Sequence, residues 1–194
     1  IDDDDKLFSN PTIQHEIVTY VEGFKNLTLK FLSSRGIPKG WVTKMWNRAF
    51  VQACTDGCRY FFQCGDDIYF ETKGWVHDSV EQLKVNNNIG LTGPIDNGRF
   101  VNDDPIFKPG GNRFVHTQAF VSIRHMEIFG TFFPEHIKNW FCDDWITRVY
   151  YPDHFYTIDH YLKNIGGDPR YDVETNCPWE QLIVLAREHL KKFV

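Results

Sequence analysis

Two pairs of adjacent aspartates are the residues of this sequence best suited to chemistry. The first, Asp66 and Asp67, directly follows the stretch YFFQCG at residues 60–65. Two neighbouring carboxylates repel each other, and a hard divalent cation with oxygen ligands removes that repulsion. The pair therefore predicts a metal site. A plain turn is the alternative, because Gly and Asp both favour one.

The second pair, Asp143 and Asp144, lies among aromatic residues in the stretch NWFCDDWI. A structural role is open to it, with Asp143 as the N-cap of a helix and Asp144 in the first turn, where acids suit the helix dipole. A catalytic role is the alternative, because an acid held among aromatic rings has a raised pKa and can accept a proton near neutral pH. A third pair, Asp103 and Asp104, lies in a predicted loop and is expected to be solvated.

Downstream of these acids, two histidines and one arginine could complete a site. His160, in TIDHYLKNIGG, and His154, in YPDHF, could join the acids as metal ligands, and His160 is the preferred candidate. Arg170 follows two glycines in GGDPRYDV and could approach a diphosphate. For each of the three the plainer alternative is an ordinary surface position, with Arg170 in a salt bridge.

The pattern of apolar residues predicts the elements that hold these side chains. Helices are expected over residues 11–24, from Val42 to a stop at Asp56-Gly57, and over 75–85, with strands at 27–34, 59–64 and 89–93. Strands that alternate with helices are typical of an α/β domain with a mostly parallel sheet. Ligands of such sheets collect beyond the carboxyl ends of the strands, and Asp66 and Asp67 follow such an end.

The pattern breaks at residues 94–112, which show almost no periodicity. A loop of that length inside a compact domain is usually functional or mobile. Beyond it, a strand is expected at 114–123, a short helix at 124–130, another helix in DDWITRVYY, and a closing helix from Pro178.

The length of 194 residues suits one domain with a substantial core, so a single domain over 1–194 is expected. Residues 1–6, IDDDDK, match a protease-cleavable tag, with native sequence as the alternative, and no helix or strand is expected in them. The formal charge is −5 and no cluster of Lys and Arg is present, which argues against a nucleic-acid partner. For the same reason, a phosphate ligand should arrive with a divalent cation.

Composition also bears on location and on the type of ligand. No run approaches the roughly 20 apolar residues of a membrane span. Five cysteines without a paired metal-binding pattern favour a reducing compartment, so a cytoplasmic location is expected, with a lumenal domain of a larger protein as the alternative. The chain is rich in aromatic residues, with 17 Phe, 8 Tyr and 6 Trp, and such side chains suit a sugar-stacking surface.

Four stretches in order carry a resemblance to a known family: WNRAFVQACTDGCRYFFQCGDDI, GLTGPID, HTQAFVSIRHMEIFG and FFPEHIKNWFCDDWITRVY. Together they resemble the GT-A class of metal-dependent nucleotide-sugar glycosyltransferases, most closely forms from large DNA viruses and protists. The resemblance covers roughly residues 41–174. It implies a GT-A-like, Rossmann-like fold with a mostly parallel sheet flanked by helices, and a chain that starts at or after the first strand of that fold.

The resemblance also assigns roles to the first acidic pair. The D-x-D metal motif of the class falls on Gly65-Asp66-Asp67, so Asp67 would bind the Mn²⁺ or Mg²⁺ that carries the donor diphosphate. Gly65 departs from the motif, because an acid that contacts the donor ribose is usual there. Asp66 would take over that contact with the nucleotide sugar, or add a ligand to the metal.

The other roles implied by the resemblance concern the second half of the chain. Asp144, with Asp143 beside it, would match the acidic pair that supplies the base in inverting members. His160 would be the downstream metal ligand of the class, and Arg170 would bind the nucleotide sugar.

The function predicted from these features is a metal-dependent hexosyltransferase. It would transfer a sugar from a nucleotide-diphosphate donor to a hydroxyl of a glycan or protein, and inversion at the anomeric carbon is expected. Two alternatives remain: a metal-independent glycoside hydrolase that uses two carboxylates, and a carbohydrate-binding domain without catalysis.

Overall fold

The computed structural model spans residues 1–194 and describes all of them except residues 2–3, 98–114 and 167–169. The chain divides into two compact units, Ile1–Trp41 and Val42–Val194, whereas the sequence predicts a single domain over 1–194. All the predicted catalytic, metal-binding and nucleotide-sugar-binding residues belong to the second unit.

The first unit contains one helix, α1 (Pro11–Glu22), among its described residues. Its start follows from the sequence, because the side chain of Asn10 accepts a hydrogen bond from Thr12 N at 2.9 Å and a proline occupies the first helical position. The helix buries none of its side chains. The predicted helix at 11–24 is therefore confirmed, two residues shorter at its end.

The strand predicted at 27–34 is wrong, because the structure has no strand there. Ser34 N instead donates to Ile1 O at 2.8 Å, and the amino group of Ile1 donates to Leu32 O at 2.6 Å. A strand needs a neighbouring backbone with which to form a ladder, and a β-favouring pattern alone does not provide one.

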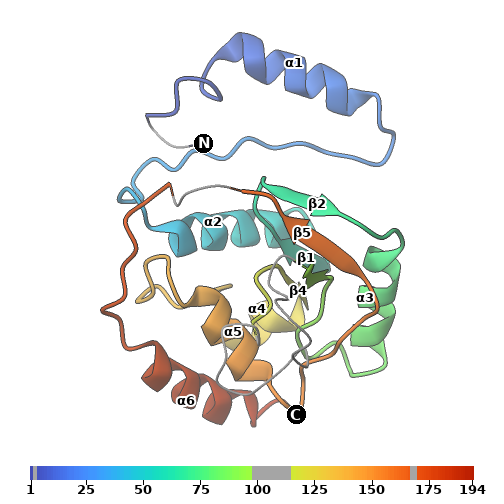
Figure 1. The fold of residues 1–194 in the computed structure, drawn as a ribbon, viewed down its shortest axis with the longest axis vertical. Coiled ribbons are helices and arrows are strands. Elements are labelled where there is room, and N and C mark those ends of the chain that lie inside the picture. Colours follow the sequence, from blue (N-terminus) through green and yellow to red (C-terminus); the bar gives the residue numbers. More distant parts are fainter. Residues whose placement is uncertain (2–3, 98–114, 167–169) are drawn as a thin grey trace. The chain divides into compact units, whose positions relative to one another are not determined.

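The second unit carries five helices and five strands in its described part (Figure 1). Its helices are α2 (Val42–Thr55), α3 (Trp75–Lys84), α4 (Arg124–Phe129), α5 (Cys142–Tyr150) and α6 (Trp179–Leu190). Its strands are β1 (Tyr60–Gln63), β2 (Ile68–Phe70), β3 (Ile95–Asp96), β4 (Ala119–Ser122) and β5 (Tyr161–Asn164). Each of the five helices was predicted, with boundaries that differ by one or two residues.

The strands form two small sheets. In one, β1 pairs with β4 in antiparallel orientation. In the other, with the order β2-β5-β3, β5 runs antiparallel to β2 and parallel to β3. Mixed helices and strands agree with the predicted α/β class, but the predicted mostly parallel sheet is wrong for the strands that the structure describes. Apolar patterning reports which strands are buried and says nothing of their direction.

The segment at 89–93, predicted as a strand, forms two isolated bridges instead. Leu91 pairs with Phe155, and Thr92 pairs with Phe120 of β4. Gly90 interrupts a regular strand here, because its φ of 145° is a conformation that residues with a side chain rarely adopt. A Cβ atom at Gly90 would also overlap the ring of Tyr156.

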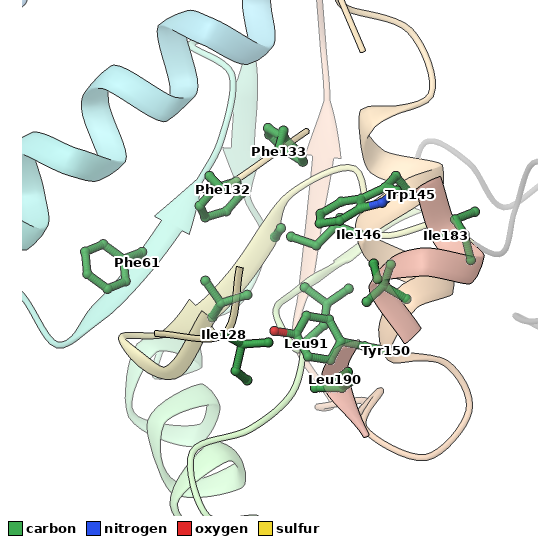
Figure 2. Packing of buried hydrophobic residues seen from close by; sticks show 14 of the residues in the cluster. Phe61, Leu91, Ile128, Phe132, Phe133, Trp145, Ile146, Tyr150, Ile183 and Leu190 are labelled. Atoms are coloured by element: carbon green, nitrogen blue, oxygen red, sulfur yellow. The ribbon is translucent and has the colours of Figure 1, made fainter. Parts of the chain in front are cut away.

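The core of the second unit is mainly aliphatic and aromatic. Figure 2 shows ten of its members by name: Phe61, Leu91, Ile128, Phe132, Phe133, Trp145, Ile146, Tyr150, Ile183 and Leu190. Phe50 of α2 packs edge-on against Phe61 of β1, with ring centroids 4.5 Å apart. Side chains of strands β1 and β4 and of several helices meet in this cluster, so the core holds the sheet of β1 and β4 against those helices.

One histidine is part of this core. His125 donates from Nε2 to Phe132 O at 3.0 Å and accepts at Nδ1 from the hydroxyl of Tyr150 at 2.8 Å. Burial lowers the pKa of His125 from 6.5 to about 4, so the ring is neutral near pH 7. Both nitrogens are used in hydrogen bonds, which indicates a structural role.

Candidate functional site

The carboxyl ends of three strands meet at one edge of the second unit. Strands β3 and β5 are parallel, so their carboxyl ends lie side by side. Ile68, the first residue of β2, pairs with Asn164 at the end of β5, which brings the preceding Asp67 to the same edge. The turn after β1 joins it as well, because Gly65 N donates to the side chain of Gln118 at 3.1 Å. We call this region, formed by Asp66, Asp67, Asp96, Thr117, Gln118, Asn164 and Gly166, the acidic edge.

Asp67 is held closely within the acidic edge. Its carboxylate lies so near Gly65 and Gly166 that a Cβ atom on either glycine would overlap it. Its backbone carbonyl accepts a hydrogen bond from Ile165 N at 2.8 Å. Asp66, its neighbour, is exposed. The carboxylate of Asp67 is therefore held and half-buried, whereas that of Asp66 is exposed. Both residues follow β1, as the sequence predicts.

Asp96 is a third acid of this edge, and it was not among the predicted site residues. It is only 9% exposed. One carboxylate oxygen accepts from Asn164 N at 3.3 Å and the other from Thr117 Oγ1 at 3.4 Å. Asp96 and Asp67 thus contact the same short segment, residues 164–166. The signal in the sequence was an acid directly after the apolar run of GLTGPI.

The second acidic pair lies in the first turn of α5. The helix begins at Cys142 and its N-cap is Phe141, so the proposed capping role of Asp143 is corrected. Asp143 instead accepts a hydrogen bond at Oδ1 from Asp144 N at 3.0 Å. Asp144 Oδ1 lies 3.5 Å from a guanidinium nitrogen of Arg148, one turn further along the helix.

A buried hydrogen bond connects α5 to the acidic edge. Thr147 of α5 accepts from His116 N at 2.9 Å, and the next residue, Thr117, bonds to Asp96. Asp144 lies three residues before Thr147 and therefore on the same face of the helix. The sequence separates Asp144 from Asp96 by 48 positions, yet both belong to elements joined through residues 116–117.

His116 adds a buried imidazole beside this connection. Burial lowers its pKa from 6.5 to about 4, and its ring centroid lies 4.9 Å from that of Phe155. Within the described part of the chain, its Nε2 has no hydrogen-bond partner. A buried polar atom without a partner is uncommon in folded proteins, and here it lies next to the candidate site.

His160, the predicted third metal ligand, lies at the other end of β5. It donates from Nε2 to Asp78 at 2.7 Å, and its Nδ1 is 3.0 Å from the hydroxyl oxygen of Thr72. Ile165, which contacts Asp67, lies five residue steps along nearly extended chain from His160, a span of roughly 16 Å. The structure therefore does not bring His160 and Asp67 together.

Of the remaining predicted residues, the structure describes His154 and Arg170. His154 Nδ1 is 3.4 Å from the hydroxyl of Tyr156, and its backbone carbonyl accepts from Leu91 N. Arg170 is exposed, and the residues before it at 167–169 are outside the described residues. So are Asp103, Asp104 and most of the predicted 94–112 loop.

Asp66 and Asp67 are too few to hold a metal ion by protein ligands alone, but they could hold one that a substrate also binds. Among the described residues, no group of three His, Cys, Asp or Glu side chains is placed to hold a metal ion. Asp66 and Asp67 nevertheless supply hard oxygen ligands next to each other. Mg²⁺ is commonly bound by one or two carboxylates together with substrate phosphates and water, and these two residues suit such a site.

Comparisons with family models, with curated proteins and with solved structures found no match to this chain. The GT-A resemblance therefore remains a hypothesis based on the order of four stretches. No helix in the described ranges is long and apolar enough to cross a membrane.

Proposed function

We propose that this protein is a glycosyltransferase that moves a sugar from a nucleotide-diphosphate sugar to a hydroxyl acceptor, with Mn²⁺ or Mg²⁺ and with inversion. The main support is the acidic edge. Asp67 and Asp96 contact one segment at the carboxyl ends of β1, β3 and β5, and Asp144 lies on the helix that residues 116–117 join to that edge. This reaction requires carboxylates that bind the metal ion and a separate carboxylate that accepts the proton of the acceptor hydroxyl.

The donor side of the proposal uses the first pair. Asp67 would hold the divalent ion with help from the exposed Asp66, and the ion would supply the positive charge that stabilises the diphosphate leaving group. Asp96 keeps the 164–166 segment in place through Asn164 N. A chain with a net charge of −5 needs such a cation to hold an anionic donor.

The acceptor side uses the second pair. Asp144 would accept the proton of the acceptor hydroxyl as it attacks the anomeric carbon. Trp140, 49% exposed and four residues earlier, offers an aromatic face on which a sugar ring could stack. The acceptor would then be a glycan, or a protein hydroxyl presented beside one.

A carbohydrate-binding domain without catalysis is the second candidate. It is favoured by the exposed aromatic residues near the acids, which include Tyr69 at 63% exposure as well as Trp140. Such a domain would bind sugars without metal and would have no affinity for nucleotides.

Thermal unfolding with a panel of UDP-, GDP- and dTDP-sugars, each with and without Mn²⁺, tests the proposal. A ligand that binds only the native state raises the unfolding midpoint, so one donor should raise it and should need Mn²⁺ to do so. Free sugars that raise the midpoint without metal, when no nucleotide sugar does, would favour the binding domain. Sugar hydrolysis that a chelator does not inhibit would favour a glycoside hydrolase.

A further inference from the structure

The backbone immediately before the second acidic pair has an unusual conformation. Phe141, the N-cap of α5, has φ 70° and ψ 6°, in the left-handed region. Bulky residues rarely adopt that conformation and keep it only where their surroundings hold it. Here the ring of Phe141 stacks on Trp179, the first residue of α6, with centroids 5.0 Å apart and planes 10° from parallel.

Trp179 has a second partner, and that partner is charged. The guanidinium carbon of Arg148 lies over the Trp179 ring, 5.4 Å from its centroid. The same guanidinium is 3.5 Å from Asp144 Oδ1. Arg148 Nε is buried and has no hydrogen-bond partner in the part of the chain that the structure describes. The face of an indole ring attracts a cation. The Trp179 ring therefore helps to hold the Arg148 guanidinium in place, although Nε makes no hydrogen bond within the described part of the chain.

Helix α6 also holds Arg148 through its backbone. Arg187 donates from Nε to Arg148 O at 2.9 Å, and its guanidinium also bonds to Tyr151 O. The beginnings of α5 and α6 meet at Phe141 and Trp179, and their ends meet at Arg187, so the two helices run in the same direction. Arg148 is therefore fixed from α6 at both its side chain and its carbonyl.

We infer that Trp179 is a positioning residue for Asp144, acting through Arg148. An exposed ion pair between two flexible side chains is weak, because both must be ordered to form it. Arg148 and Asp144 are only 32% and 21% exposed, and the indole orders the arginine in advance. The charged groups near Asp144 on its own helix are Arg148 and Asp143. From α6, the uncharged Trp179 ring contacts the Arg148 side chain, and the charged Arg187 contacts the Arg148 carbonyl.

The inference rests on the proposed function where it treats Asp144 as the base, but the coupling can be measured without any activity. The probe is the side-chain carboxyl resonance of Asp144 in protein labelled with ¹³C-aspartate. Arg148→Gln should move this resonance, and Trp179→Leu should move it in the same direction. In the Arg148→Gln background, Trp179→Leu should cause little further change, because the path through the arginine is already lost.

Leu185→Ala, at an exposed position of α6, is the matched control and should leave the resonance in place. If Trp179→Leu does not fold, Trp179→Met fills similar space without an aromatic face and takes its place in the same cycle. The inference would be overturned if the Asp144 resonance did not move in Trp179→Leu. It would also be overturned if Trp179→Leu moved the resonance by the same amount with and without Arg148→Gln.

Transfer kinetics give a second readout. If Trp179 positions the base, Trp179→Leu should lower kcat about 10-fold and leave the KM for the donor unchanged, whereas Trp179→Phe should restore part of the rate. A rise in KM with an unchanged kcat would contradict positioning. A wild-type protein without transfer would defeat the proposed function, while the NMR cycle would still decide whether Trp179 acts on Asp144.

Discussion

The carboxylate of Asp67 occupies the space beside Gly166 that the Cβ atom of any other residue would fill. The same carboxylate lies close to Gly65, so two glycines leave room for one acid. This packing fixes the position of the Asp67 carboxylate, which the proposed metal site needs. A side chain at Gly166 would move that carboxylate, so a substitution there tests the site.

Gly166→Ala should therefore weaken the Mn²⁺-dependent affinity for the nucleotide sugar. The added methyl group would displace the Asp67 carboxylate, and overpacking of this kind costs about 1–3 kcal/mol. Isothermal titration calorimetry with and without Mn²⁺ measures the effect. Lys163→Ala, at an exposed position of β5, is the control and should bind normally. Normal metal-dependent binding by the glycine variant would show that the Asp67 carboxylate can move freely.

Asp67→Ala should abolish the coupling between metal and nucleotide while the protein stays folded. The two adjacent carboxylates repel each other without a cation, so loss of one should not destabilise the metal-free protein. Asp66→Ala should have a smaller effect, because Asp66 is exposed and Asp67 is the residue held by its surroundings. Calorimetry that finds the same Mn²⁺-dependent affinity in Asp67→Ala as in the wild type would remove Asp67 from the metal site.

His160→Ala distinguishes a metal ligand from a structural residue. Because His160 bonds to Asp78 and Thr72 at the far end of β5, its loss should leave Mn²⁺ affinity unchanged. The free energy of unfolding should fall by about 1–2 kcal/mol, because two hydrogen bonds are removed. Urea denaturation and Mn²⁺ titration measure the two quantities. A clear loss of Mn²⁺ affinity would restore His160 as the ligand that the sequence predicts.

The helices could be predicted because their information is local. Helix α2 ends at Thr55, directly before the Asp56-Gly57 stop, and the apolar residues of α5 and α6 recur at helical spacing. Strand pairing could not be predicted in the same way. Strands β2 and β5 have only three and four residues, and each finds its partner more than 90 positions away. Their pairing depends on the tertiary structure rather than on a local pattern.

The same limit explains which site residues were found. Asp66 and Asp67 follow β1, which is apolar enough to be recognised, so their place at a strand end is confirmed. Asp96 follows the apolar run GLTGPI, but it belongs to a strand of only two residues, and its bonds to Asn164 and Thr117 depend on the tertiary structure. His160 was predicted as a ligand from its order in the sequence. Strand β5 was not predicted, so the sequence did not show that His160 lies at the end of β5 away from Asp67.

Acid should destabilise the protein through its two buried histidines. Burial lowers the pKa values of His116 and His125 from 6.5 to about 4, so between these values the unfolded chain binds more protons than the folded one. Stability is then full above about pH 6.5 and is lost as pH falls toward 4, by roughly 3 kcal/mol for each histidine. Urea denaturation at pH 7.5, 6 and 5 measures this slope. His125→Gln should make it shallower, and an unchanged slope would mean that His125 does not titrate in this range on unfolding.

Asp144→Asn tests the proposed base. Asparagine keeps the size of the side chain and its acceptor oxygen toward Arg148, but it cannot take a proton from the acceptor hydroxyl. Donor binding should therefore survive, whereas transfer should fall 10²- to 10⁴-fold, the order expected when a positioned base is removed. Calorimetry with the donor and a transfer assay separate the two effects.

Asp143→Asn is the matched control for this last change. Asp143 Oδ1 accepts a hydrogen bond from Asp144 N, and the amide oxygen of asparagine can accept the same bond, so stability and transfer should both stay close to wild type. Asp144 lies beside Arg148 and, through it, is linked to Trp179, which is why it is the proposed base. If transfer is lost in Asp143→Asn and kept in Asp144→Asn, the base is Asp143. If neither change affects transfer, the pair stabilises the first turn of α5 and the proton goes elsewhere.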